Sequence, residues 1–224
     1  MFFKRSYNKE IIDDLSIKDE RIDTALKELK LINNTLGGYS VSGKAFLNLL
    51  DHQVERKKIL DVGAGSSDIL MKLKKKKANI DLFTLDINMR ACWYNKSINK
   101  LGNVVCADIN NLPFSGKYFD YVHASLFFHH FEENKISQIL QSLSGIAKKA
   151  IIINDLRRSL PAYLGIRMLT LLFSKSNMVK NDAPLSVKRG FVKSDIIKFT
   201  KGLSFNKVII KRRWAFRWMI IIYL

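Results

Sequence analysis

Residues 59–68 carry the feature that most restricts the fold of this chain: an apolar run that passes at once into a glycine-rich turn and then into a helical segment. Gly63 can adopt a backbone conformation that is strained for other residues, and the absent side chains of Gly63 and Gly65 allow a ligand to lie against the backbone. The helix that follows presents unpaired N–H groups to such a ligand. This segment therefore predicts the first strand-turn-helix unit of an α/β sheet, with a binding site where the strand ends.

From residue 57 onward, short β-rich runs alternate with helical segments, which is typical of a parallel sheet with crossover helices. The expected strands cover residues 58–62, 80–86, 103–107, 119–124 and 150–154, and the runs 205–211 and 215–223 are expected to pair as a hairpin. We therefore predict an α/β, Rossmann-like, seven-stranded and mostly parallel sheet, with helices on both faces, a C-terminal antiparallel hairpin and an N-terminal helical cap.

The apolar spacing divides the chain into a leader and one larger domain. Amphipathic helices are expected near residues 23–36 and 43–50, so residues 1–55 are predicted to form a helical cap or lid, and 56–224 the binding domain. Within that domain, residues 160–173 predict an inserted apolar helix that begins near Pro161. The polar segment 177–189, which contains Pro184, predicts a loop.

The glycine turn departs from the dinucleotide-binding pattern, because Asp68 stands where the third glycine of G-x-G-x-x-G is expected and would repel phosphate. The run Asp61-Val62-Gly63-Ala64-Gly65-Ser66-Ser67 instead resembles the first motif of class I S-adenosylmethionine (SAM)-dependent methyltransferases, with Ser67 in place of a glycine. Residues 111–114 and 119–125 also resemble that family. Residues 126–131 resemble its small-molecule branch related to ubiquinone/menaquinone biosynthesis methyltransferases. The likeness covers about residues 57–155.

The resemblance implies SAM as the cofactor and a set of residues around it. The turn would hold the methionine end, Asp86 the ribose hydroxyls and Asp108 the adenine amino group. The cofactor-binding residues expected on this basis are Asp61, Gly63, Ala64, Gly65, Asp86, Ile87, Asp108, Ile109 and Ser125. Acids at strand ends are also common as helix caps, and a cap is the alternative for each acid taken singly.

Two adjacent histidines follow the fourth expected strand. His129 and His130 are candidate general bases that would take a proton from the methyl acceptor; alternatively, they cap the next helix or pack beneath the cofactor. Asp155 and Arg158, after the fifth strand, are candidates to orient the acceptor, or else a cap and a solvent-facing cation. No metal is expected, because two adjacent histidines on a turn do not easily face one ion and no carboxylate pattern accompanies them.

Composition bears on partners and location. The chain has 38 Lys and Arg residues against 20 Asp and Glu, a net charge of +18, which suits an acidic carrier protein or an anionic surface but also fits lysine-rich solvated faces. Cys92 and Cys106 are expected to be reduced and buried. No signal peptide is expected at residues 1–5, and Arg167 and Lys175 interrupt the longest apolar stretch, so no transmembrane segment and a cytoplasmic location are predicted.

The sequence thus predicts a SAM-dependent methyltransferase that acts on a small, apolar or aromatic metabolite, with O-methylation favoured. An RNA methyltransferase is the alternative that the basic charge suits. Nucleic acid is not the expected partner, since the chain has no Asn-Pro-Pro-Tyr-type motif, no cysteine placed as a nucleophile and no appended RNA-binding module. A second alternative is a SAM-binding fold that does not catalyse and serves as a scaffold.

Overall fold

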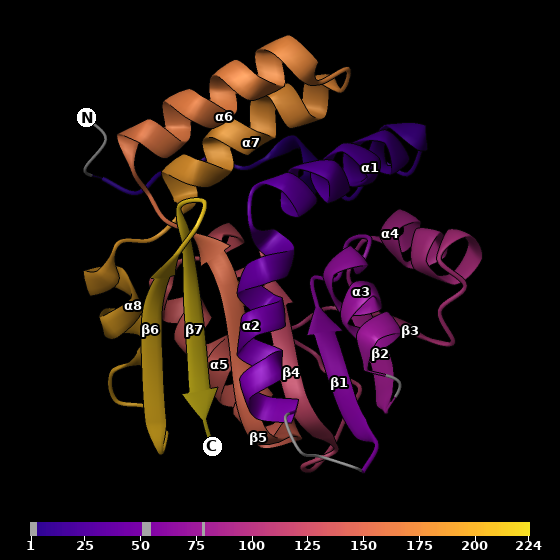
Figure 1. Cartoon of the computed structure of the whole chain (residues 1–224), viewed down its shortest axis with the longest axis vertical. Coiled ribbons are helices and arrows are strands. Elements are labelled where there is room, and N and C mark those ends of the chain that lie inside the picture. The colour runs from indigo at the N-terminus through magenta and orange to yellow at the C-terminus, as the bar shows by residue number, and fades with distance from the viewer. Residues whose placement is uncertain (1–3, 51–54, 78) are drawn as a thin grey trace.

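The computed structural model describes residues 4–50, 55–77 and 79–224, so the expectations for residues 1–3 and for the segment around 51–54 lie outside the described residues. One seven-stranded sheet, in the order β3-β2-β1-β4-β5-β7-β6, forms the centre of the molecule (Figure 1). The strands are β1 (Lys57–Val62), β2 (Ile80–Asp86), β3 (Asn103–Cys106), β4 (Phe119–Ser125), β5 (Ala147–Leu156), β6 (Lys207–Arg213) and β7 (Arg217–Tyr223). Strands β1 to β5 pair in parallel, and β7 runs antiparallel to both β5 and β6. The predicted fold class, including the terminal hairpin, is confirmed.

Helices cover both faces of this sheet (Figure 1). The helical elements are η1 (Ile11–Asp13), α1 (Glu20–Thr35), α2 (Gly38–Leu50), α3 (Asp68–Lys76), α4 (Met89–Trp93), η2 (Tyr94–Ile98), η3 (Phe128–His130), α5 (Glu133–Ile146), α6 (Leu160–Phe173), α7 (Asn177–Arg189) and α8 (Lys193–Thr200). Successive residues of a strand point to opposite faces, so Ile151 and Ile153 pack with α5 and α8, while Ile152 packs with α2 and α3. The central strands are therefore apolar on both faces, as parallel strands between two helical layers must be.

The predicted N-terminal cap consists of two structurally different pieces. Helix α2 begins at Gly38, earlier than the sequence pattern predicts, and its Phe46 is fully buried against the sheet beside Ile59 and Tyr121. This helix belongs to the core layer. The part before it, with η1 and α1, lies above the ends of the strands, where a cap was expected (Figure 1).

The prediction of a loop over residues 177–189 is wrong, because these residues form helix α7 with Pro184 inside it. Proline in a helix interior removes one N–H donor and disfavours the helix. Here tertiary packing outweighs that cost: Met178 and Val179 pack with α1, and Val187 packs with α6. Ser176 caps the start of α7 by accepting a hydrogen bond from Val179 N.

Two smaller expectations about exposure have different outcomes. Cys92 is buried, but Cys106 is exposed, so its predicted burial is wrong; it is the last residue of β3, the strand at one edge of the sheet. Within the described part of the chain, no helix combines the length and apolarity needed to cross a bilayer.

Candidate active site

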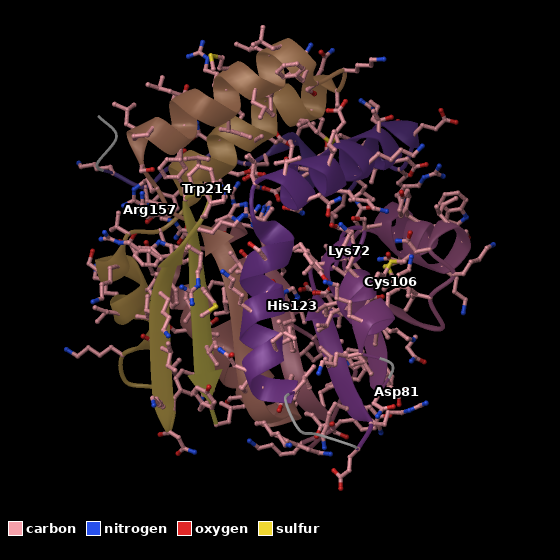
Figure 2. The ribbon with its side chains drawn as sticks, viewed as in Figure 1. Lys72, Asp81, Cys106, His123, Arg157 and Trp214 are labelled. Carbon is pink, nitrogen blue, oxygen red and sulfur yellow. The ribbon has the colours of Figure 1, made fainter. Side chains whose placement is uncertain are left out.

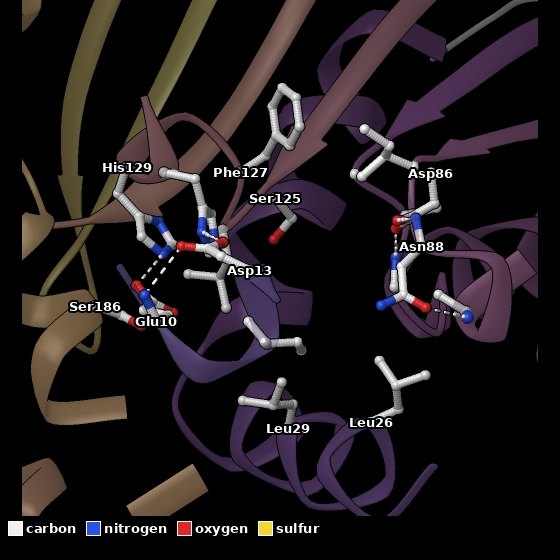
Figure 3. Close-up of a pocket in the computed structure, with 18 of the residues that line it drawn as sticks. Glu10, Asp13, Leu26, Leu29, Asp86, Asn88, Ser125, Phe127, His129 and Ser186 are labelled. Atoms are coloured by element: carbon white, nitrogen blue, oxygen red, sulfur yellow. Dashed lines mark hydrogen bonds and ion pairs between the residues drawn. The ribbon is translucent and has the colours of Figure 1, made fainter. Parts of the chain in front are cut away.

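A cavity of about 570 Å³ opens where β1, β2 and β4 end, and α1, η1 and α7 form its opposite wall. Its volume falls in the range of about 300–1,000 Å³ that is usual for small-molecule sites. Figure 3 shows the two ends of this cavity, with Asp86 and Asn88 on one side and Glu10 and His129 on the other. The glycine turn and the histidine pair therefore face one shared space.

The turn after β1 has the backbone that its glycines predict. Gly63 and Gly65 have φ values of +58° and +47°, in the left-handed region. A Cβ on Gly63 would stand 2.1 Å from the ring of Phe127, so even alanine would collide there. Side-chain amides hold the turn from outside, because Asn95 donates to the Gly65 carbonyl at 2.8 Å and Asn99 to the Ser66 carbonyl at 2.8 Å.

Ser67, which replaces the third motif glycine, adopts a left-handed conformation with φ +49°. Its hydroxyl donates to Asp61 Oδ2 at 2.6 Å, a bond that glycine could not make. The other oxygen, Asp61 Oδ1, lies 2.7 Å from His123 Nδ1, and His123 Nε2 lies 2.8 Å from Ser42 Oγ on α2. Asp61 thus anchors the turn to a buried network at the centre of the sheet, where Figure 2 labels His123.

Asp86 and Asp108 line the same cavity, as predicted, and both also brace local backbone. Asp86 accepts from Gly65 N and from Asn88 N, each at 2.9 Å, and burial raises the pKa of this carboxyl. Asp108 Oδ1 accepts from Asn110 N at 2.8 Å. These backbone contacts leave room for the predicted ligand contacts, because a carboxylate oxygen has more than one acceptor site.

Besides Glu10 Oε1, which has only the ion pairs described below, two buried oxygens on the wall of this cavity have no hydrogen-bond partner among the described residues. Ser125 Oγ is one, and Figure 3 shows it between the two ends of the cavity. Asp68 Oδ2 is the other; its companion Oδ1 accepts from Ser66 Oγ at 2.8 Å, and burial raises the pKa of the carboxyl. Unpartnered buried oxygens are costly, so both are suited to receive donors from a bound ligand.

The second end of the cavity contains a buried chain of charged groups centred on His129. Its Nδ1 lies 2.7 Å from Asp155 Oδ1, and its Nε2 lies 3.5 Å from Glu10 Oε1. Burial alone would lower the pKa of His129, but the two carboxylates outweigh it and raise the pKa to about 9. The same contacts lower the pKa of Glu10 and of Asp155 against the opposing effect of burial. His129 therefore carries a proton at neutral pH.

His130 is held differently. Its Nδ1 lies 2.6 Å from Asp13 Oδ1, and Arg189 donates to Asp13 Oδ2 at 3.0 Å. His130 is only part-buried and lines the cavity with its ring 4.3 Å from that of His129. A carboxylate on Nδ1 fixes the tautomer that leaves Nε2 as an acceptor. Of the two predicted bases, His130 has the arrangement that suits proton removal.

Helix α7 holds the N-terminal segment in this position. Asp182 accepts from Ile11 N and Ile12 N at 2.8 and 3.0 Å, and Ser186 donates to Glu10 Oε2 at 2.9 Å. Arg189 donates to the His129 and His130 carbonyls at 3.0 and 2.7 Å. Glu10, Asp13, Asp182 and Arg189 were not predicted from the sequence, because they come from a leader of irregular pattern and from a segment expected to be a loop.

Asp155 and Arg158 do not line the cavity, so the structure does not support their predicted role as direct acceptor contacts. Asp155 is fully buried behind His129. Arg158 donates to the Gly190 carbonyl at 2.7 Å and lies 3.2 Å from Asp195. Asp155 is better described as a positioning residue for His129, and Arg158 as a link between β5 and α8.

Contrary to the sequence-based argument, carboxylates do accompany the two histidines. Glu10, His129 and His130 place one ligand atom each within 4.8 Å of one another, close enough for a metal ion. An ion would have to displace the proton of His129 and compete with Arg189, which lies 3.7 Å from Glu10 Oε1. The absence of a metal remains a prediction.

Comparisons with known proteins agree with the resemblance read from the sequence. Residues 59–150 match the family model described as a methyltransferase domain. Over 97 residues the chain is 25% identical to the demethylmenaquinone methyltransferase of Thermotoga maritima, a match that covers 43% of this chain and 42% of that relative. The matched part is thus less than half of the curated relative.

Solved structures extend the likeness in fold to nearly the whole chain. The plantazolicin methyltransferase BpumL, in complex with a desmethylplantazolicin analogue and S-adenosylhomocysteine (SAH), is 18% identical with a TM-score of 0.66, over 95% of this chain and 97% of that one. A Nostoc punctiforme protein proposed to be an O-methyltransferase is 12% identical with a TM-score of 0.61, over 95% and 68%. The magnesium protoporphyrin IX methyltransferase of Synechocystis is 16% identical with a TM-score of 0.53, over 82% and 81%.

Proposed function

We propose that this chain, whose residues 59–150 match a methyltransferase domain, transfers the methyl group of SAM to a small, apolar or aromatic acceptor, with a hydroxyl oxygen as the favoured methyl-accepting atom. One observation carries the proposal: the glycine turn, Asp86 and Asp108 share a single cavity with the histidine pair. In this arrangement a bound cofactor and the group that would activate the acceptor would share the same space.

The residues at the first end of the cavity fit SAM. Gly63 and Gly65 line the cavity, so the backbone of the turn can contact the methionine part, and the unpartnered Asp68 Oδ2 offers an acceptor for the methionine ammonium. Asp86 and Asp108 supply carboxylate oxygens for ribose and adenine, with Ile87 and Ile109 beside them. When bound, SAM supplies an electrophilic methyl group on a sulfonium, and the protein has to align the acceptor with it and exclude water.

We assign the removal of the acceptor proton to His130. During methyl transfer, the hydroxyl proton of the acceptor would pass to His130 Nε2, and Asp13 would stabilise the resulting imidazolium through Nδ1. The protonated His129 beside it favours an acceptor oxygen that develops negative charge. An ionisable hydroxyl fits this pair better than an unactivated carbon, which is why oxygen is favoured.

The wall opposite the sheet favours an apolar acceptor. Apolar side chains of η1, α1 and α7 line it: Ile12, Ile22, Leu26, Leu29, Met178 and Val179. Leu26 and Leu29 face the charged groups across the cavity in Figure 3. An apolar wall with a few polar groups at one end binds ligands that combine an apolar body with one polar group.

Calorimetry with SAM and SAH tests the cofactor assignment. Asp86→Ala removes the predicted ribose contact and is expected to weaken SAM binding by about 1–3 kcal/mol. Asp81→Ala, an acidic residue at the start of the same strand that pairs with Arg56, is the control and is expected to bind normally. Binding of neither compound by the unmodified protein would favour the non-catalytic scaffold over an enzyme.

Incubation with labelled SAM and an extract of the native cell tests the activity and searches for the acceptor. The label is expected in small molecules; label in RNA would favour the RNA methyltransferase. His130→Asn should lower the rate while leaving the SAM affinity unchanged, because His130 acts on the acceptor.

We further propose a cytoplasmic location, consistent with two free cysteines, and an anionic partner for the basic surface, either an acidic carrier protein or an anionic surface.

A further inference from the structure

Helix α6 presents an apolar face that nothing in the described structure covers. Its exposed large side chains are Leu160, Leu164, Met168, Leu171, Leu172 and Phe173, with between 51% and 78% of their surface accessible. Positions four residues apart share one face of a helix, so most of these side chains form a continuous stripe. Figure 1 shows α6 at the outer edge of the molecule, with α7 beside it on the inner side. A contiguous apolar patch of this kind marks an interaction site.

The opposite face of α6 explains why the helix stays in place without its outer partner. Ala162, Ile166 and Thr170 are buried, and the first two pack with Val187 of α7. Replacing exposed side chains on the outer face would therefore leave these contacts intact. The stripe is a surface feature that can be altered without removing core packing.

The charge around this face is positive. Residues 156–181 contain five Lys and Arg residues and no Asp or Glu, and Arg167 and Lys175 are exposed on α6 and directly after it. The nearby acid Glu28 is already engaged, because its carboxylate accepts from Ser174 Oγ, Lys175 N and Ser176 N. The apolar stripe is thus bordered by positive charges, and residues 156–181 contain no acidic side chains that would neutralise them.

We infer that α6 docks this chain on an anionic lipid surface. An amphipathic helix with aliphatic and aromatic residues on one side and basic residues beside them lies in the plane of such an interface, with its apolar face in the acyl boundary. Anionic headgroups complement Arg167 and Lys175. A second copy of the chain fits less well, because it would bring two stripes with the same positive border together, on molecules of net charge +18.

Docking through α6 also bears on the class of acceptor, and this part of the inference rests on the proposed methyltransferase function. Helix α7 contacts α6 on one side, and on the other its Met178 and Val179 belong to the apolar wall of the cavity. Docking through α6 would hold the apolar acceptor wall near the membrane, where apolar molecules collect. The class of acceptor that follows is a lipid-dissolved molecule with an ionisable hydroxyl.

Vesicle flotation with the full chain tests the docking surface. The unmodified protein is expected to float with vesicles of 70% phosphatidylcholine and 30% phosphatidylglycerol, and far less with phosphatidylcholine alone. The double variant Leu172→Ser/Phe173→Ser keeps every charge and is expected to partition at least about tenfold more weakly. The control Ile98→Ser/Ile197→Ser replaces two exposed apolar residues on η2 and α8 and is expected to float like the unmodified protein.

Three outcomes would overturn the inference. In the first, the unmodified protein floats with neither vesicle. In the second, the α6 variant floats as well as the unmodified protein, which would mean attraction by net charge alone. The third outcome is a dimer in sedimentation velocity that the α6 variant no longer forms. SAM affinity is measured on the same variants and is expected to be unchanged. Failure of the docking surface therefore leaves SAM binding intact, and failure of the proposed enzyme function appears as absent SAM binding whether or not vesicles are bound.

Discussion

The buried chain Glu10–His129–Asp155 predicts that the stability of the protein falls when the solution becomes alkaline. His129 has a pKa raised to about 9 in the folded protein, against 6.5 for a free histidine. A raised pKa means that the proton stabilises the folded state: the contribution is fully present below pH 6.5, declines between pH 6.5 and 9, and is lost above that. The difference corresponds to about 3 kcal/mol of unfolding free energy.

Glu10 and Asp155 do not contribute over this interval. The pKa of each carboxyl is lowered in the folded state, so both are ionised throughout the range from pH 6.5 to 9, and their contributions disappear only toward acid. Within this buried chain of three groups, the predicted loss on the alkaline side therefore comes from His129.

Urea unfolding at pH 6, 7, 8 and 9.5 measures this loss. The control is His129→Asn, whose amide can donate to Asp155 Oδ1 in place of Nδ1 but cannot titrate. The variant is expected to be less stable at pH 6 and to approach the unmodified protein at pH 9.5. Parallel curves for the two proteins over the whole range would refute the argument that His129 carries a buried proton.

Three further predictions concern other parts of the site. Gly63→Ala is expected to lose more than about 1 kcal/mol of stability and most SAM affinity, because its Cβ would stand 2.1 Å from the Phe127 ring and its backbone is left-handed. An unchanged melting temperature and affinity would contradict the proposed role of the turn. In thiol titration with a disulfide reagent, exposed Cys106 is expected to react in the folded protein, whereas buried Cys92, whose pKa burial raises, reacts only after unfolding. Methyl transfer is expected to persist after dialysis against a chelator, and loss of activity restored by a divalent cation would instead assign a metal to Glu10, His129 and His130.

Local patterns in the sequence determine the sheet and one end of the site. Strands buried on both faces need continuous apolar runs, and a turn that binds a ligand needs glycines. Both features therefore depend on residues that are neighbours in the sequence. For this reason Gly63, Asp86 and Asp108 could be named from the sequence as the residues expected to hold the cofactor, and the structure places all three on one cavity. Ser67 was recognised only as a departure from the motif; the structure shows that its hydroxyl bonds Asp61.

The tertiary structure alone decides the other end of the site. Asp13 and His130 are 117 positions apart, and no local pattern indicates that they meet. They do so because α7, which forms despite Pro184, uses Asp182 and Arg189 to hold the N-terminal segment beside the histidines. Periodicity indicates how a segment packs, but which distant carboxylate faces which histidine depends on the free energy of the whole packed core. The sequence therefore indicated the residues at the glycine-turn end of the cavity, whereas only the fold showed the partners of the histidine end.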